Sequence, residues 1–202
     1  IHTLLVMGSN IAVSAPRVLH IQEKLKQLDC LVAVDFFLSE TAQLADIVLP
    51  ATQWAEEEGT TANLEGRVLL RKPALAPPPG VRSEIAILCE LAQRLGKGEY
   101  FPFTEPSQVF AELRRASAGG PADYAGITYE KITAQDGVFW PCPTEEHPGT
   151  PRLFQQGFPT SSGRARFHAV RHQAPAEEPD AAYPLYLTCL LYTSDAADDL
   201  TR

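Results

Sequence analysis

The chain has 202 residues, 45% of them hydrophobic, which is enough for one domain with a packed core, or for one domain and part of a second. Its 17 lysines and arginines against 25 aspartates and glutamates give a net charge of −8, which argues against a nucleic-acid-binding module with a basic face. No apolar run approaches the roughly 20 residues of a membrane-spanning helix, and the four cysteines lie too far apart for a zinc, redox or iron–sulfur motif, so we expect a cytoplasmic protein that does not act at a membrane.

The first fifty residues alternate between short apolar runs and helical patterns. Residues 3–7 and 31–34 are predicted to be buried strands, and residues 47–49 a third strand that a proline ends. Between these runs, apolar residues recur at helical spacing over 18–28, and residues 39–45 are predicted to form a short helix. Alternating strands and helices favour a parallel, Rossmann-like sheet with right-handed crossovers and flanking helices, which is an α/β fold.

Two further helices are predicted after a polar, irregular stretch over residues 53–71. Ser83 is expected to cap the first, and residues 106–116 are expected to form the second. The apolar positions expected to be buried are Ile85, Leu88, Leu91, Ala92 and Leu95 on the first helix and Val109, Phe110 and Leu113 on the second.

The chain is predicted to become irregular toward its end. Residues 119–163 are rich in glycine, proline and aromatic side chains with little periodicity, so we expect a long surface excursion. Residues 164–170 are predicted to be a strand, 173–182 a linker, and 184–188 the beginning of a strand in a new domain. Because the chain begins without an initiator methionine or signal peptide, we expect it to be an internal piece of a longer protein.

Residues 189–202 read CLLYTSDAADDLTR and differ in character from the rest. They resemble the conceptual translation of a transposase-based sequencing adapter, and the alternative is a genuine acidic C-terminal helix. We expect an artefact and leave this segment out of the functional reasoning.

Polar residues follow the predicted strands where a parallel sheet binds ligands, at the carboxyl ends. The turn Gly8-Ser9-Asn10 follows the first strand, Asp35 ends the second, and residues 54–59 follow the third. Small residues let a backbone approach a ligand, and a carboxylate accepts hydrogen bonds from ribose or guanine. Two alternatives remain open: Asp35 is a turn former, and Glu56-Glu57-Glu58 is a solvated charge run. Neither a GxGxxG nor a GxxxxGK[ST] fingerprint is present.

The cysteines and histidines carry no clear chemistry of their own. Cys30 and Cys89 lie among apolar residues and are expected to be core thiols. Cys142 and His147 share a loop but lack the second pair of ligands that a metal site needs. No nucleophile–base arrangement is evident from spacing.

Several motifs resemble those of molybdopterin-dependent oxidoreductases of the dimethyl sulfoxide reductase superfamily, over nearly all of residues 1–188. They are DFFLSETAQLADIVLP (35–50), WAEEEG (54–59), TANLEGRV (61–68), PPG (78–80), ITYE (127–130) and WPCP (140–143). The turn Gly8-Ser9-Asn10 is similar to the family's Gly-Ser/Thr-Asn-Pro turn, with Ile11 in place of proline. Within the superfamily, the NLEGR version of the third motif, TANLEGRV, is most similar to cytoplasmic assimilatory nitrate reductases.

The resemblance implies an enzyme that carries a molybdenum bis(molybdopterin guanine dinucleotide) cofactor and a 4Fe–4S cluster, with the cluster ligands and the molybdenum ligand outside this chain. It implies reduction of nitrate to nitrite by oxygen-atom transfer, with electrons from a donor protein or subunit, and no activity for this piece alone. It also implies that no catalytic or metal-ligating residue lies here.

The family's cofactor-binding residues carry over to six positions. Gly8, Ser9 and Asn10 match the turn beside one guanine dinucleotide, and Asp35 matches a strand-end acid that contacts the guanosine. Glu84 matches an aspartate position that touches the dinucleotide. Glu57 stands where some relatives have a cofactor-contacting lysine, so the charge is reversed.

The implied domains are the C-terminal half of a guanine-dinucleotide-binding α/β domain (1–118), a loop-rich extension of it (119–172), a linker (173–182) and the start of a C-terminal β-barrel (183–188), with the adapter-like tail at 189–202. One alternative function is the alpha subunit of a formate dehydrogenase, which would act on formate. Another, of a different class, is the large iron–sulfur subunit of NADH–quinone oxidoreductase, which has no molybdenum. A generic nucleotide-binding domain explains the sheet but not the combined motifs.

Overall fold

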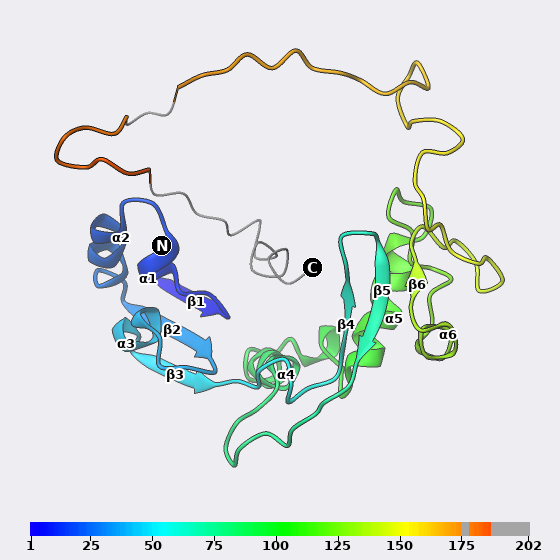
Figure 1. Cartoon of the computed structure of the whole chain (residues 1–202). Coiled ribbons are helices and arrows are strands. Elements are labelled where there is room, and N and C mark those ends of the chain that lie inside the picture. Colours follow the sequence, from blue (N-terminus) through cyan, green and yellow to red (C-terminus); the bar gives the residue numbers. More distant parts are fainter. Residues whose placement is uncertain (175–177, 187–202) are drawn as a thin grey trace. The chain divides into compact units, whose positions relative to one another are not determined.

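The computed structural model describes residues 1–174 and 178–186 (Figure 1). The chain divides into two compact units, Ile1–Leu153 and Phe154–Arg202. In the part that the structure describes, no helix has the length and apolar character needed to cross a membrane.

The first unit begins with the predicted parallel sheet. Strands β1 (Thr3–Met7), β2 (Cys30–Asp35) and β3 (Ile47–Pro50) pair in the order β1-β2-β3, with Met7 beside Val34 and Asp35 beside Pro50. The connections contain α1 (Ile11–Ser14), α2 (Val18–Leu25) and α3 (Glu40–Leu44). This confirms the α/β fold with a parallel sheet and flanking helices, which the apolar runs predicted.

Helix α2 and the turn-like helix α1 are packed against the sheet by one apolar cluster. Its buried members are Val6, Ala12, Leu25 and Leu31. A second cluster joins the sheet to helix α4 (Glu84–Arg94) through Val34, Ala51 and Ile87. Because α4 follows the sheet by more than thirty residues, this contact brings the start of α4 to the carboxyl ends of the strands.

The stretch 53–71, predicted to be irregular, instead contains a hairpin. Strands β4 (Gly59–Ala62) and β5 (Arg67–Arg71) are antiparallel, and the short β6 (Val138–Phe139) pairs with β5. The turn is built by Asn63, whose Oδ1 accepts hydrogen bonds from the backbone N–H groups of Glu65 (3.0 Å) and Arg67 (2.9 Å). Gly66 completes the turn in a left-handed conformation, φ +83°, that glycine adopts without strain. The prediction missed the hairpin because the strands are short and lack strict alternation.

The prediction of a surface excursion is wrong for most of residues 119–150. Helices α5 (Pro106–Ser117) and α6 (Tyr129–Gln135) form a core together with β5 and β6. A 3-10 turn, Gly98–Tyr100, precedes α5 in the chain. Its buried members are Val68, Phe110, Ile127, Ile132, Val138 and Cys142. Residues 151–163, in contrast, are exposed, as expected.

The two long helices bury faces that differ from the predicted ones. On α4 the buried residues are Ile87, Cys89 and Ala92, of which only Ala92 was on the predicted face; Ile85 and Leu88 are half-buried, and Leu91 and Leu95 are exposed. On α5 only Phe110 is buried. Each helix is packed along only part of its apolar face within the described residues. Of the two thiols expected in the core, Cys89 is buried and Cys30 is partly exposed.

The second unit contains no helix or strand within residues 154–174 and 178–186. The strand predicted over 164–170 is therefore wrong, and those residues are exposed. The predicted start of a β-barrel falls partly on residues 183–186, which form no strand, and partly on 187–188, which lie outside the described residues, as does the adapter-like segment 189–202.

Candidate functional site

The turn after β1 is held against the end of β2. The N–H of Gly8 donates to the carbonyl oxygen of Val34 at 2.9 Å, and Gly8 has a left-handed φ of +55°. A Cβ atom on Gly8 would lie 3.7 Å from Oε1 of Glu84, the first residue of α4. The carboxyl group of Glu84 therefore lies over the turn, and two of the predicted residues, 76 positions apart in sequence, are neighbours.

Asn10 is occupied by contacts within the chain. Its Oδ1 accepts hydrogen bonds from the N–H of Thr41 (3.1 Å) and from Oγ1 of Thr41 (2.9 Å), and its Nδ2 donates to Oε2 of Glu40 (2.6 Å). The buried Thr41 in turn accepts from the N–H of Ala12 at 2.9 Å. Asn10 thus joins the turn to α3, whereas Ser9 beside it is exposed and forms no side-chain hydrogen bond with the described residues.

Asp35 forms a turn, as one of the two open interpretations held. Its Oδ1 accepts from the N–H groups of Phe36 (2.8 Å) and Phe37 (3.4 Å), and its Oδ2 accepts from the hydroxyl of Ser39 at 2.8 Å. Ser39 is also the N-cap of α3. Since a carboxylate has about four acceptor positions, these three contacts leave Asp35 with room for one more donor.

Glu57 is held by two side chains. Its Oε2 accepts from the hydroxyl of Thr52 at 2.7 Å, and its Oε1 lies 3.4 Å from Nη2 of Arg71. Glu57 is therefore part of an ion pair with Arg71 rather than a member of a solvated charge run.

Glu84 is the third carboxyl group of the cluster and has a perturbed acidity. Burial raises the pKa of Glu84, and the negative charges of Glu57 and Asp35 raise it further. Ser83 caps the helix with its hydroxyl, which accepts from the N–H of Ala86 at 3.2 Å, as predicted. The structure therefore brings Gly8, Asp35, Glu57 and Glu84 together, from four different segments.

A pocket of about 290 Å³ adjoins this carboxyl cluster. Its polar lining includes Glu57, Glu84 and Arg71, and its apolar lining comes from α4, α5 and Tyr129. The hydroxyl of Tyr129 is buried and has no hydrogen-bond partner among the described residues, and burial raises the pKa of this phenol, with a further contribution from Glu58. The sequence pattern did not predict this pocket, because the residues that line it are spread along the sequence from Glu57 to Tyr129.

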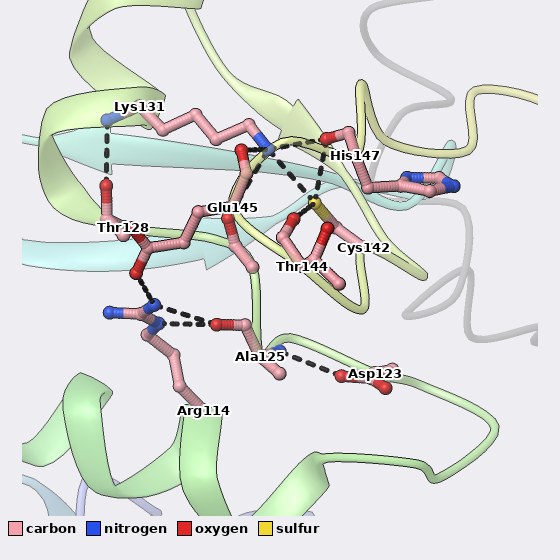
Figure 2. Close-up of polar contacts among 10 residues, drawn as sticks. Arg114, Asp123, Ala125, Thr128, Lys131, Cys142, Thr144, Glu145 and His147 are labelled. Carbon is pink, nitrogen blue, oxygen red and sulfur yellow. Dashed lines mark hydrogen bonds and ion pairs between the residues drawn. The ribbon is translucent and has the colours of Figure 1, made fainter.

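Cys142 and His147 lie in a polar network outside the carboxyl cluster (Figure 2). The ammonium group of Lys131 donates to the carbonyl oxygens of Glu145 (2.8 Å), His147 (2.5 Å) and Gly126 (3.4 Å), and lies 3.3 Å from Sγ of the buried Cys142. Nδ1 of His147 accepts from the N–H of Gly149 at 3.0 Å. Over residues 1–174 and 178–186, no group of three or more histidine, cysteine or acidic side chains is arranged to hold a metal ion.

Comparison with known proteins identifies the family. Residues 1–94 match the model of the family described as Molybdopterin oxidoreductase. The chain is 45% identical, over 187 residues, to the assimilatory nitrate reductase catalytic subunit of Bacillus subtilis (strain 168); the match covers 92% of this chain and 26% of that protein. The chain belongs to the molybdopterin oxidoreductase family.

Other members of the molybdopterin oxidoreductase family are almost as similar. The F420-dependent formate dehydrogenase subunit alpha of Methanocaldococcus jannaschii is 43% identical over 185 residues, which cover 92% of this chain and 27% of that protein. Among solved structures, the acetylene hydratase from Pelobacter acetylenicus aligns with a TM-score of 0.54 and 24% identity over 66% of this chain and 18% of that chain, which supports the fold alone. The chain thus spans about a quarter of the length of these curated relatives.

Proposed function

We propose that this chain is part of a molybdenum-dependent nitrate reductase and that it contributes to binding the guanosine end of a molybdopterin guanine dinucleotide. The family assignment supports a molybdopterin enzyme, and the 45% identity to an assimilatory nitrate reductase catalytic subunit favours nitrate as the substrate. When bound, the cofactor supplies the oxygen-atom transfer that turns nitrate into nitrite. A 4Fe–4S cluster and an electron-donor protein, both held outside this chain, and a cytoplasmic location complete the proposal.

The chemistry of the residues fits the guanosine end of such a cofactor. Guanine presents N–H donors at N1 and N2, and ribose presents hydroxyl donors. A protein site that binds either group therefore needs hydrogen-bond acceptors. Asp35 retains one acceptor position at the end of β2, and the turn at Gly8 has no Cβ to block a ligand that approaches the backbone. The meeting of Gly8, Asp35 and Glu84 at the strand ends is the observation on which this proposal rests.

The same residues fit a diphosphate poorly. The cluster contains three carboxyl groups, and its cation, Arg71, is paired with Glu57 at 3.4 Å. We therefore assign the guanosine, and not the diphosphate, to Asp35. Ser9, exposed at the turn, is the proposed neutral donor toward the ligand, Asn10 holds the turn in place, and Glu57 acts through its charge on Glu84.

The proposal is tested by nucleotide binding to the full chain. The probe is GDP-mannose, which presents guanosine and a diphosphate without a titrating terminal phosphate, and GDP-mannose binding is measured by titration calorimetry against ADP-ribose as the adenine counterpart. Asp35→Asn keeps an oxygen for the N–H of Phe36 but removes the charge and one acceptor. Since a hydrogen bond to a charged group is worth about 1.5–3 kcal/mol, the affinity should fall about 10- to 100-fold.

Asp29→Asn is the matched control, because Asp29 is exposed and its carboxyl group pairs with His2, away from the carboxyl cluster. Equal affinity of the Asp35→Asn and wild-type chains, or equal binding of guanine and adenine probes, would remove Asp35 from the site.

Formate is the second candidate substrate, because a formate dehydrogenase subunit alpha is 43% identical to this chain. The two are separated by assaying the longer protein that carries this chain for viologen-coupled nitrate reduction and formate oxidation. Molybdenum analysis of the same preparation tests the third alternative, since an NADH–quinone oxidoreductase subunit would contain iron without molybdenum.

A further inference from the structure

Three carboxyl groups meet at the strand ends, and two of them have donors. Asp35 accepts three hydrogen bonds from its own turn, and Glu57 is satisfied by Thr52 and Arg71. Glu84 differs, because its side chain accepts no hydrogen bond and forms no ion pair within the described residues. Among the described residues, Glu84 is the one member of the cluster that no hydrogen-bond donor or cationic side chain contacts.

The surroundings of Glu84 favour its neutral form. Burial raises the pKa of Glu84 most, and the negative charges of Glu57 and Asp35 raise it further. The N-terminus of α4 favours the anion, but the net shift is upward despite it. The titratable and charged side chains that face Glu84 from the elements around it are Asp35 of β2, Glu57 and Glu58 before β4, Arg71 of β5 and Tyr129 of α6.

Glu84 is also placed to meet a ligand. Its Oε1 lies 3.7 Å from the position of a Cβ on Gly8, so the space that glycine leaves open at the turn is bounded by this carboxyl group. A nucleotide that binds its guanosine at the turn would bring acceptor atoms, O6 and N7 of guanine, toward Glu84. An ionised Glu84 would repel those atoms, whereas a protonated Glu84 would donate a hydrogen bond to one of them.

We propose that Glu84 carries a proton in the nucleotide-bound state and donates a hydrogen bond from its carboxyl group to an acceptor of the bound guanine dinucleotide, so that binding takes up one proton. The inference rests on the proposed function, because it concerns the same site. It assigns opposite roles to two acids of one cluster: Asp35 accepts from the nucleotide as an anion, and Glu84 donates to it as a neutral acid.

Glutamine at position 84 distinguishes donation from acceptance. The amide of Glu84→Gln is a permanent uncharged donor, so this variant should bind GDP-mannose at pH 8 at least as tightly as the wild-type chain binds it at pH 5. Its affinity should also be independent of pH. In the wild-type chain the affinity should fall as the pH rises through the titration of Glu84, by up to about tenfold per pH unit for one linked proton.

The experiment is titration calorimetry of GDP-mannose with the full chain from pH 5 to pH 8, in two buffers with different ionisation enthalpies. The difference in heat between the buffers measures the protons taken up, expected to be close to one near the midpoint of the profile and zero in Glu84→Gln. Glu112→Gln, an exposed residue of α5, removes one negative charge elsewhere and should behave as wild type. Circular dichroism confirms that each variant is folded.

A second variant tests the inference without altering Glu84. Glu57→Gln removes one of the two charges that act on Glu84 and frees Arg71, so the midpoint of the pH profile should move to lower pH. This holds even if Glu84→Gln does not fold.

The outcomes separate the two proposals. Tighter binding at high pH, or weaker binding by Glu84→Gln, would mean that Glu84 accepts and would overturn the inference alone. Binding without any pH dependence or proton uptake would also overturn only the inference. If GDP-mannose does not bind the folded wild-type chain at any pH, both the proposed function and the inference fail.

Discussion

Replacing Lys131 by methionine should destabilise the first unit by about 3 kcal/mol. The ammonium group of Lys131 holds together three carbonyl oxygens from two separate segments, at 2.5 Å (His147), 2.8 Å (Glu145) and 3.4 Å (Gly126). Methionine keeps the length of the side chain but donates nothing. Each hydrogen bond from a charged donor is worth about 1.5–3 kcal/mol, and the contact with Glu145 is exposed enough for water to replace it. The two part-buried hydrogen bonds, to His147 and Gly126, contribute about 1.5 kcal/mol each, which gives the expected loss of about 3 kcal/mol.

Urea unfolding, followed by tryptophan fluorescence, measures this change. Trp140 packs against the core that contains Cys142, so its emission reports on the same region. Lys72→Met is the matched control, because Lys72 is exposed, and its unfolding free energy should stay within about 0.5 kcal/mol of wild type. Lys131→Arg should restore only part of the loss, since a planar guanidinium cannot converge on carbonyls that surround a point charge. A Lys131→Met chain as stable as the control would refute the idea that the ammonium group anchors these loops.

Three further changes test other parts of the structure. Gly126→Ala should cost about 3 kcal/mol or more by urea unfolding, because its Cβ would lie 1.9 Å from the backbone oxygen of Thr144; a loss below about 1 kcal/mol would contradict this packing. Tyr129→Phe should leave stability unchanged or raise it by up to about 1 kcal/mol, because it removes a buried hydroxyl that has no partner in the described part of the chain; a clear loss would reveal a partner for that hydroxyl. Because folding raises the pKa of Glu84, the folded state retains the proton to higher pH than the unfolded chain does. The unfolding free energy should therefore fall as the pH rises from 4.5 through the raised pKa of Glu84. This contribution to the pH dependence of the unfolding free energy should disappear in Glu84→Gln.

The parallel sheet could be predicted because its information is local. Each strand is a short apolar run between helical patterns, and its length and the polar residues or proline that end it indicate a buried parallel strand. The cap of α4 was equally visible, since Ser83 precedes the apolar pattern and accepts from the N–H of Ala86. Such features depend on neighbours within about four residues.

The second core could not be predicted because its information is not local. Ile127, Ile132 and Cys142 form one buried cluster with Val68 of β5 and Phe110 of α5, but Ile132 lies in the seven-residue helix α6, and Ile127 and Cys142 lie in loops beside α6 and β6, where no periodicity can be recognised. The close approach of residues 126 and 144 and the contact of Lys131 with Cys142 depend on the path of the chain between them. A segment rich in glycine and proline was therefore interpreted as a surface excursion when its glycines allow backbone segments to pack tightly.

The candidate site could be predicted from the sequence only in part. Gly8 and Asp35 could be predicted because parallel strands end at one edge of a sheet, and the pairing of Asp35 with Pro50 fixes that edge. The role of Asp35 could not, since a strand-end aspartate that forms a turn and one that binds a ligand have the same sequence context. Glu84 reaches the edge only because Ile87 packs against Val34 and Ala51.

The arrangement of donors explains why Glu84, among the three acids, is the one whose protonation responds to a ligand. A carboxylate that leaves water must be compensated by hydrogen bonds, by a cation or by a proton. Asp35 accepts such hydrogen bonds within its own turn, and Glu57 is paired with the cation of Arg71. Among the described residues Glu84 has neither, so a ligand that covers the Gly8 turn would bury Glu84 further and strengthen its preference for the proton. Binding and protonation at this edge of the sheet therefore favour each other, and Glu84 is the acid at which they meet, because the donors of the cluster contact Asp35 and Glu57 instead.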